Sequence, residues 1–183
     1  MNINKYCSKF FKYTDLINCG ETFNNNMYID NLPKSQETFG AISELCKFIL
    51  DPIHDKYGKV VLTYGFASQN LTKIIKKNIY PKLDQHSGYE KNQKGEYICK
   101  RLGLACDFYM QKTKMDKVTR YIINNLPFDR LYYYRDDRPI HVSYGPDHKR
   151  QLIKMMPYKD RKIPKIISKE KFWFNWYRKS SWE

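Results

Sequence analysis

The chain has 183 residues, of which 42% are hydrophobic and 28% are charged. This length and composition indicate one globular domain and exclude an intrinsically disordered chain. Its 33 Lys and Arg against 19 Asp and Glu give a formal net charge of +14, which favours anionic partners such as nucleic acid, wall polymers or an acidic membrane surface. The abundance of Lys, Asn, Ile and Tyr is equally what an AT-rich genome would produce.

The five cysteines are odd in number and form no CxxC pair, which argues against a disulfide framework and favours a reducing compartment. The opening residues, MNINKYCSKFFKYTD, lack the apolar segment of a signal peptide. No apolar stretch approaches the roughly 18–20 residues that span a bilayer. We expect a protein without a membrane span that is cytoplasmic at synthesis. Action on a cell wall would then require release by lysis or carriage on a phage or virus particle. The oligomeric state stays open.

The first predicted element is a helix over residues 39–53, where apolar side chains recur at the spacing of one helical face. Pro52 predicts a kink near its end, and Gly58 is suited to close it. Residues 60–64 (VVLTY) predict a short buried strand. A second helix is expected over residues 69–79.

The second half of the chain begins with a polar, basic stretch at residues 87–102, which predicts a long loop or a hairpin. A strand is expected over residues 102–110 and a helix over residues 115–126. Two further strands are expected over residues 129–135 and 140–144. The fold class that follows is α+β, with a small antiparallel sheet flanked by helices.

The end of the chain differs from the rest in charge and in hydrophobic periodicity. From residue 145 it is basic and poorly periodic, and its last segment, KFWFNWYRKSSWE, contains all three tryptophans. Interleaved aromatic and basic side chains suit a wall polymer or a nucleic acid, and they equally suit a segment folded back over the core. We assign residues 1–146 to the principal domain, and residues 147–183 to a C-terminal extension that packs on it or flanks it.

A candidate metal site consists of His86, Asp107 and His141. Asp107 and His141 lie in otherwise apolar strands, where a carboxylate is costly unless it is paired or bound to a cation. Two imidazoles and one carboxylate are a common zinc set, which leaves the fourth position to a water molecule that zinc activates. The alternative is that each residue is an ordinary hydrogen-bonded core or edge residue. Cys106 should point to the opposite face of its strand from Asp107 and pack in the core.

Five segments occur in an order that is informative: FFKYTDL (10–16), LCKFILDPIHDKYGKVVLTYGFAS (45–68), DQH (84–86), GLACD (103–107) and FDRLYYYRDDRPIHVSYG (128–145). This order resembles the D-alanyl-D-alanine carboxypeptidase-like zinc metallopeptidases, which have the Hedgehog/DD-peptidase fold. The resemblance implies that His86, Asp107 and His141 bind zinc, because each stands where the family has a zinc ligand. Ser143 is a candidate to orient one of these ligands.

Three departures from the family pattern concern the site. Residues 87–102 are an insertion, which we expect to rim the site. The arginine that helps relatives hold an anionic substrate group is replaced by Ala67. The acidic residue that relatives carry shortly before the last zinc histidine is Arg138 here, so the general base of the reaction is assigned to Asp137 or Asp136. Both acids are also typical of a turn between strands.

We therefore predict a zinc-dependent hydrolase, most readily a peptidase that cleaves peptidoglycan peptide stems as a D,D-carboxypeptidase or endopeptidase. Ser68, Tyr64 and Arg138 are the residues expected to contact the substrate. One alternative is a metal-dependent enzyme of the same fold that acts on another substrate such as nucleic acid, which the basic charge and Ala67 favour. The other is a non-catalytic binding or structural domain, which the lack of an acid at position 138 favours.

Overall fold

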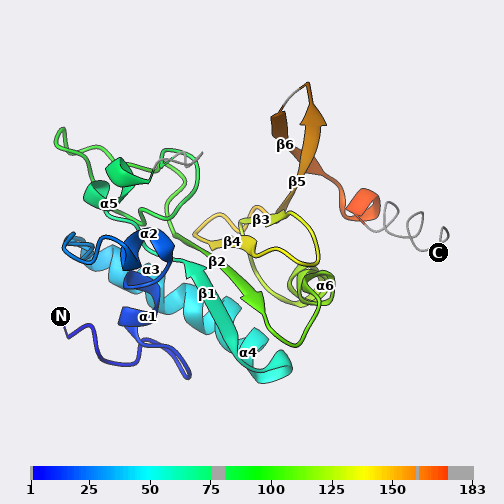
Figure 1. Ribbon diagram of the computed structural model, residues 1–183, viewed down its shortest axis with the longest axis horizontal. Helices are drawn as coiled ribbons and strands as arrows, with labels where there is room; N and C mark the ends of the chain where they lie inside the picture. The colour runs from blue at the N-terminus through cyan, green and yellow to red at the C-terminus, as the bar shows by residue number, and fades with distance from the viewer. Residues whose placement is uncertain (1, 76–80, 160, 173–183) are drawn as a thin grey trace.

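The computed structural model describes residues 2–75, 81–159 and 161–172. The helices of this part are α1 (Tyr13–Ile17), α2 (Glu21–Asn24), α3 (Gln36–Leu45), the π-helical segment η1 (Cys46–Leu50), α4 (Asp51–Tyr57), α5 (Gln69–Ile74) and α6 (Met115–Asn125). The strands are β1 (Val60–Tyr64), β2 (Leu104–Met110), β3 (Arg130–Tyr133), β4 (Ile140–Tyr144), β5 (Gln151–Tyr158) and β6 (Arg161–Ile167). Together they form a mixed α/β fold, in which all six strands belong to one sheet (Figure 1).

The sheet has the strand order β1-β2-β4-β3-β5-β6. Four of its pairs are antiparallel, but β3 and β5 run parallel. The expectation of an antiparallel sheet is therefore wrong at this one junction. The chain turns back after β4, where the Arg150 N–H donates to the Phe128 carbonyl and the Gln151 N–H donates to the Asp129 carbonyl. These bonds lay β5 along β3 in the same direction.

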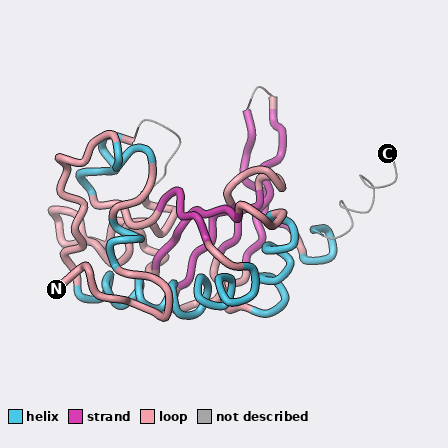
Figure 2. The backbone as a smooth tube through the Cα atoms, turned by 60° about the horizontal axis from the view of Figure 1, so that its bottom comes forward, coloured by secondary structure: helices cyan, strands magenta, loops and turns pink. Residues whose placement is uncertain are grey.

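The two faces of the sheet differ sharply, because side chains alternate along each strand. One face is apolar and buried, and the long helical stretch α3–η1–α4 and the helix α6 lie along it (Figure 2). Its buried members on the four inner strands include Leu104, Cys106, Phe108, Leu131, Ile140, Val142 and Leu152. The expected orientation of Cys106 into the core is confirmed. The opposite face carries Asp107 and His141, so the candidate site lies on the side of the sheet away from the main helices.

The longest helical stretch runs through α3, η1 and α4 and contributes much of this core, including Ile42, Leu45, Ile49 and Ile53. The helix expected over residues 39–53 is therefore confirmed. Its irregular part, η1, ends just before Pro52, whose ring and missing N–H disturb the regular hydrogen-bond ladder. Gly58 closes α4 with φ +84°, and its N–H donates to the His54 carbonyl at 2.9 Å.

Other elements also follow the sequence pattern. The strands expected near residues 60–64 and 102–110 are β1 and β2, and the helix expected over residues 115–126 is α6. The expectation that residues 60–64 are buried is wrong, because β1 is an edge strand in which only Val60 is buried. The helix expected over residues 69–79 is observed as Gln69–Ile74, and residues 76–80 lie outside the described part of the chain.

The described part of the C-terminal extension forms β5, β6 and a short helical turn over residues 169–172 that follows them. The β5–β6 hairpin continues the sheet and projects away from the body of the molecule (Figures 1 and 2). The three tryptophans that prompted the prediction of a binding tail lie outside the described residues. Within the described ranges, no helix combines the length and the apolar character needed to cross a membrane.

Candidate metal centre

Two strands and one loop bring the three predicted ligands together. Asp107 of β2 and His141 of β4 are directly opposite each other in the antiparallel ladder, so both side chains lie on the same face of the sheet. His86 approaches from the turn before residues 87–102. One donor atom from each residue lies within 4.8 Å of the other two. The three side chains therefore form a group that is able to hold a metal ion.

The orientation of His86 is fixed by the loop that follows β1. Its Nδ1 lies 2.8 Å from the carbonyl oxygen of Gly65, which can only accept a hydrogen bond. Nδ1 therefore carries a proton, and Nε2, which faces Asp107, is the nitrogen left to bind a metal ion when the ring is neutral. The Ala67 N–H also donates to the His86 carbonyl at 3.0 Å. This is the arrangement that typically orients a metal-binding histidine.

The distances within the group suit a small divalent cation. His141 Nδ1 lies 2.8 Å from Asp107 Oδ1, and His86 Nε2 lies 3.6 Å from the same oxygen. Ligand atoms around a tetrahedral zinc are roughly 3.3 Å apart for bond lengths of about 2.0–2.1 Å. The observed distances lie on either side of that value, so a cation can enter with small adjustments.

Electrostatics pair the carboxylate with both imidazoles. Burial alone would raise the pKa of Asp107, but hydrogen bonds and positive charge from His141 and His86 outweigh it and lower the pKa below its usual range. Burial would likewise lower the pKa of His86, but its bonds to Asp107 and Gly65 raise it. The Asp107 side chain is 30% exposed, against 4% for His86 and 7% for His141. The group is therefore open to solvent on the carboxylate side.

Several polar atoms at the site are buried without a hydrogen-bond partner among the described residues. They include the Tyr64 hydroxyl, Asp84 Oδ1 and His141 Nε2. Buried polar atoms of this kind are uncommon in folded proteins and often mark a place for a ligand, ion or water molecule. The Tyr64 ring packs edge-on against the His86 ring at a centroid distance of 4.3 Å. The predicted substrate residue Tyr64 therefore lies at the metal group.

The acids proposed as the general base lie in the turn between β3 and β4. Asp136 accepts a short hydrogen bond from the Tyr133 hydroxyl, and Tyr133 packs on the helix-covered core. Asp137 pairs with Arg135 at 3.2 Å, and both side chains are largely exposed. Arg138 is also exposed in this turn. The structure gives neither acid a contact with the metal group, so their catalytic role stays a prediction.

The two predicted serines have structural partners. The Ser68 hydroxyl caps α5 by accepting from the Leu71 N–H at 3.2 Å. The Ser143 hydroxyl donates to Gln85 Oε1 at 2.7 Å, and Gln85 directly precedes His86. Ser143 thus holds the turn that carries His86, and it makes no hydrogen bond to His86, Asp107 or His141.

Three residues at the site were not predicted from the sequence. Asp84 interacts electrostatically with all three members of the metal group, and burial raises its pKa. The ring of Tyr132 packs edge-on against His141 at 5.0 Å. Desolvation of the hydroxyl raises the pKa of Tyr134, and the charges of Asp107 and Asp84 contribute. Two signals in the sequence could have indicated them: Asp84 lies two residues before a predicted zinc histidine, and side chains alternate between the two faces along residues 132–134, at the end of β3.

The insertion at residues 87–102 is anchored to α3. Glu90 is buried and its Oε1 accepts three hydrogen bonds of 2.9–3.0 Å, from the N–H groups of Lys34 and Ser35 and from the Thr38 hydroxyl. Further along the insertion, Arg101 donates to the carbonyl of Leu83, close to Asp84. One end of the insertion is therefore fixed to the helix layer, and the other reaches the chain segment that carries His86.

The fold and the site define a mixed α/β domain with a His–Asp–His group able to bind a metal ion. The chain matches no family model, no curated protein and no solved structure at a significant level.

Proposed function

We propose that the protein is a zinc-dependent hydrolase that cleaves amide bonds, with peptidoglycan peptide stems as the substrate class. The observation that carries the proposal is the His86–Asp107–His141 group, in which the tautomer of His86 leaves its Nε2 lone pair free for a metal. The substrate class rests on the order of motifs that resembles D-alanyl-D-alanine carboxypeptidase-like enzymes. When bound, zinc would polarise the scissile carbonyl and lower the pKa of a bound water molecule.

We assign the general base to Asp84. A base must reach the water molecule beside the metal without being a metal ligand itself. Asp84 lies outside the three-residue group but interacts electrostatically with each of its members. Its buried Oδ1 has no partner among the described residues and is therefore available to accept a proton and return it to the leaving amine. Asp136 and Asp137 have partners of their own in the turn.

Positive charge near the site suits an anionic group on the substrate. Arg101 and Arg130 interact electrostatically with each other and with the Cys99 thiol, which Asp84 also influences. Neither arginine has a carboxylate at ion-pair distance among the described residues. We assign to them the role of the arginine that Ala67 replaces; Arg101 is held next to Asp84 by its hydrogen bond to the Leu83 carbonyl.

Metal content and hydrolysis test this function separately. Elemental analysis should find about one zinc per chain in the wild type and none in His86→Ala, Asp107→Ala or His141→Ala. Asp84→Asn should keep its zinc and lose roughly 10²–10⁴-fold of its activity on muropeptides. The matched control is the double variant Asp136→Asn/Asp137→Asn, which should keep both. A wild type without metal would refute the proposal. If only the double variant loses activity, the general base is Asp136 or Asp137 and not Asp84.

A second candidate function is metal-dependent cleavage of nucleic acid, which the net charge of +14 favours. Incubation of the zinc-loaded protein with labelled single- and double-stranded DNA and RNA tests it. Cleavage that is lost in Asp107→Ala would support this candidate, and intact nucleic acid together with cleaved muropeptide would refute it.

A further inference from the structure

The β5–β6 hairpin carries an unusual concentration of unpaired positive charge. Lys154 of β5 and Lys165 of β6 are directly opposite each other in the antiparallel ladder, where facing side chains are close and like charges destabilise the pair. Lys171, in the turn after β6, lines the same shallow hollow. Among the described residues, none of these three ammonium groups has a carboxylate at ion-pair distance. A cluster of this kind is stabilised when an anion lies between its members.

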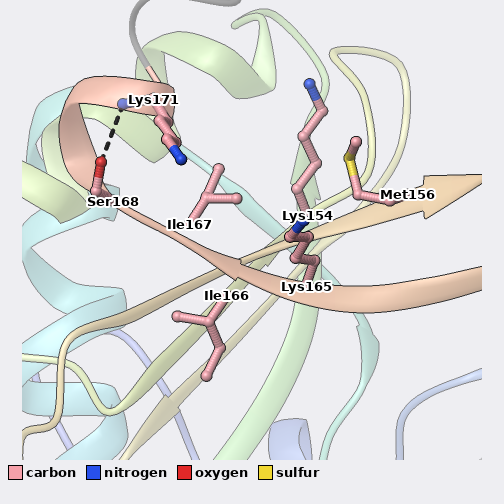
Figure 3. A pocket seen from close by; sticks show the side chains of 7 residues that line it. All are labelled: Lys154, Met156, Lys165, Ile166, Ile167, Ser168 and Lys171. Carbon is pink, nitrogen blue, oxygen red and sulfur yellow. Dashed lines mark hydrogen bonds between the residues drawn. The ribbon is translucent and has the colours of Figure 1, made fainter.

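The hollow lies at the base of the ribbon, where Lys154 of β5 is still paired with Tyr133 of β3. Figure 3 shows the side chains of Lys154 and Lys171 on one side of the ribbon with Ile167 between them, while Ile166 points to the other side. The hollow therefore combines cationic side chains with Ile167 as a small apolar floor.

The shape of the hairpin restricts the partner. Beyond Lys154, the last residue of β5 that pairs with β3, it is a two-stranded antiparallel ribbon that projects from the sheet (Figure 1). At about 3.3 Å per residue, the remaining four residues of β5 extend roughly 13 Å, and Lys154 and Lys165 lie at the base of this ribbon. The major groove of duplex DNA is about 12 Å wide and admits a two-stranded ribbon. A free polyanion would satisfy the charge but would not require a projecting ribbon.

We infer that the β5–β6 hairpin is a docking arm for double-stranded nucleic acid, in which Lys154, Lys165 and Lys171 contact backbone phosphates. This surface is separate from the metal centre, because Lys154 of β5 and Lys165 of β6 lie at least two strands away from β2 and β4, which carry Asp107 and His141. The inference does not depend on the hydrolytic activity proposed above. The arm would hold the protein at a nucleic acid whatever reaction the metal centre performs.

The test is fluorescence anisotropy of the zinc-loaded full chain with a short fluorescent DNA duplex of arbitrary sequence over a range of salt concentrations. The arm variant is Lys154→Gln/Lys165→Gln/Lys171→Gln. The matched control is Lys59→Gln/Lys112→Gln/Lys114→Gln, which removes the same charge from exposed lysines elsewhere. The wild type should bind the duplex, with a logarithmic association constant that falls linearly with the logarithm of the salt concentration.

The arm variant should reduce the salt slope by about 3 and weaken binding roughly tenfold to a hundredfold at low salt, because each lost phosphate contact removes about one unit of slope. The control should change affinity less than about twofold, since overall charge acts weakly at a distance. Thermal melting and zinc content should match the wild type in both variants. Absence of duplex binding in the wild type would overturn the inference. So would equal weakening in the two variants, or binding of linear polyphosphate as tight as binding of the duplex.

Discussion

Substitution of Asp107 by Asn should abolish the stabilisation of the protein by zinc. Asp107 Oδ1 lies 2.8 Å from His141 Nδ1 and 3.6 Å from His86 Nε2, so the carboxylate is the only negative ligand and the one that links both histidines. The amide has nearly the same shape, and it removes the charge that holds a cation. The two imidazoles keep their positions, because His86 is fixed by Gly65 and His141 by its strand.

The expected magnitude follows from mass action. Zinc at a hundredfold excess over its dissociation constant stabilises the folded state by about 2.7 kcal/mol. For a chain of this size, about 1 kcal/mol corresponds to roughly 2–4 °C in Tm, so the wild type should gain roughly 5–10 °C. Loss of a protein ligand should weaken zinc binding more than the roughly 10–100-fold caused by loss of a supporting group. At the same zinc concentration, the variant should then gain less than about 0.4 kcal/mol, or roughly 1 °C.

The assay is thermal denaturation followed by circular dichroism, with zinc and with a chelator. The shift is taken within each variant, so any change in intrinsic stability cancels. Asp137→Asn, which removes an exposed acid paired with Arg135, is the matched control and should retain the full shift. A zinc shift in Asp107→Asn as large as in the wild type would refute the ligand assignment.

Three further results are expected. Glu90→Gln keeps the side-chain shape but removes the charge that strengthens three hydrogen bonds, so urea denaturation should show a loss of about 1–3 kcal/mol; an unchanged midpoint would contradict this. Gly103→Ala should cost more than about 3 kcal/mol, because Gly103 has φ +79° and a Cβ atom would lie 2.2 Å from the Tyr144 carbonyl oxygen; a folded, equally stable variant would exclude the clash. In the metal-free protein, the lowered pKa of Asp107 stabilises the folded state above the unfolded-state pKa of about 3.9, and this stabilisation is lost as the pH falls. The raised pKa of His86 stabilises the folded state below the unfolded-state pKa of about 6.5, and this stabilisation is lost as the pH rises. Denaturant midpoints of the metal-free protein should therefore peak between these values, and a flat profile would argue against the pairing.

The parts of the fold that the sequence predicts correctly are those with a clear hydrophobic period. The long helix and the strands β2 and β4 bury regular apolar patterns, and the single carboxylate in β2 stands out against its neighbours. The short apolar run of β1 also predicts a strand, although only Val60 of it is buried. The ligand group was predictable for a related reason, since Asp107 and His141 interrupt apolar strands. His86 lies in an irregular turn with no period, and only its place in an ordered set of motifs indicated it.

The parts that escaped prediction depend on contacts between distant segments. β5 (QLIKMMPY) has one lysine among mostly apolar residues and includes a proline, a pattern that does not distinguish a projecting ribbon from a solvated tail. Its parallel pairing with β3 is set by hydrogen bonds of residues 150 and 151 to residues 128 and 129. No sequence pattern around Asp84 predicts that it is buried, because its burial depends on β1 and on the far end of the insertion, which are distant in the sequence.

The division of the ligands between strands and loop has a kinetic consequence. Asp107 and His141 are held by adjacent strands, so they separate only when the sheet itself opens. His86 is held by a turn through hydrogen bonds to Gly65 and Ala67, which can break without disturbing the core. Metal exchange should therefore proceed through excursions of this turn, at a rate faster than global unfolding, and the turn rather than the sheet sets how long the ion resides.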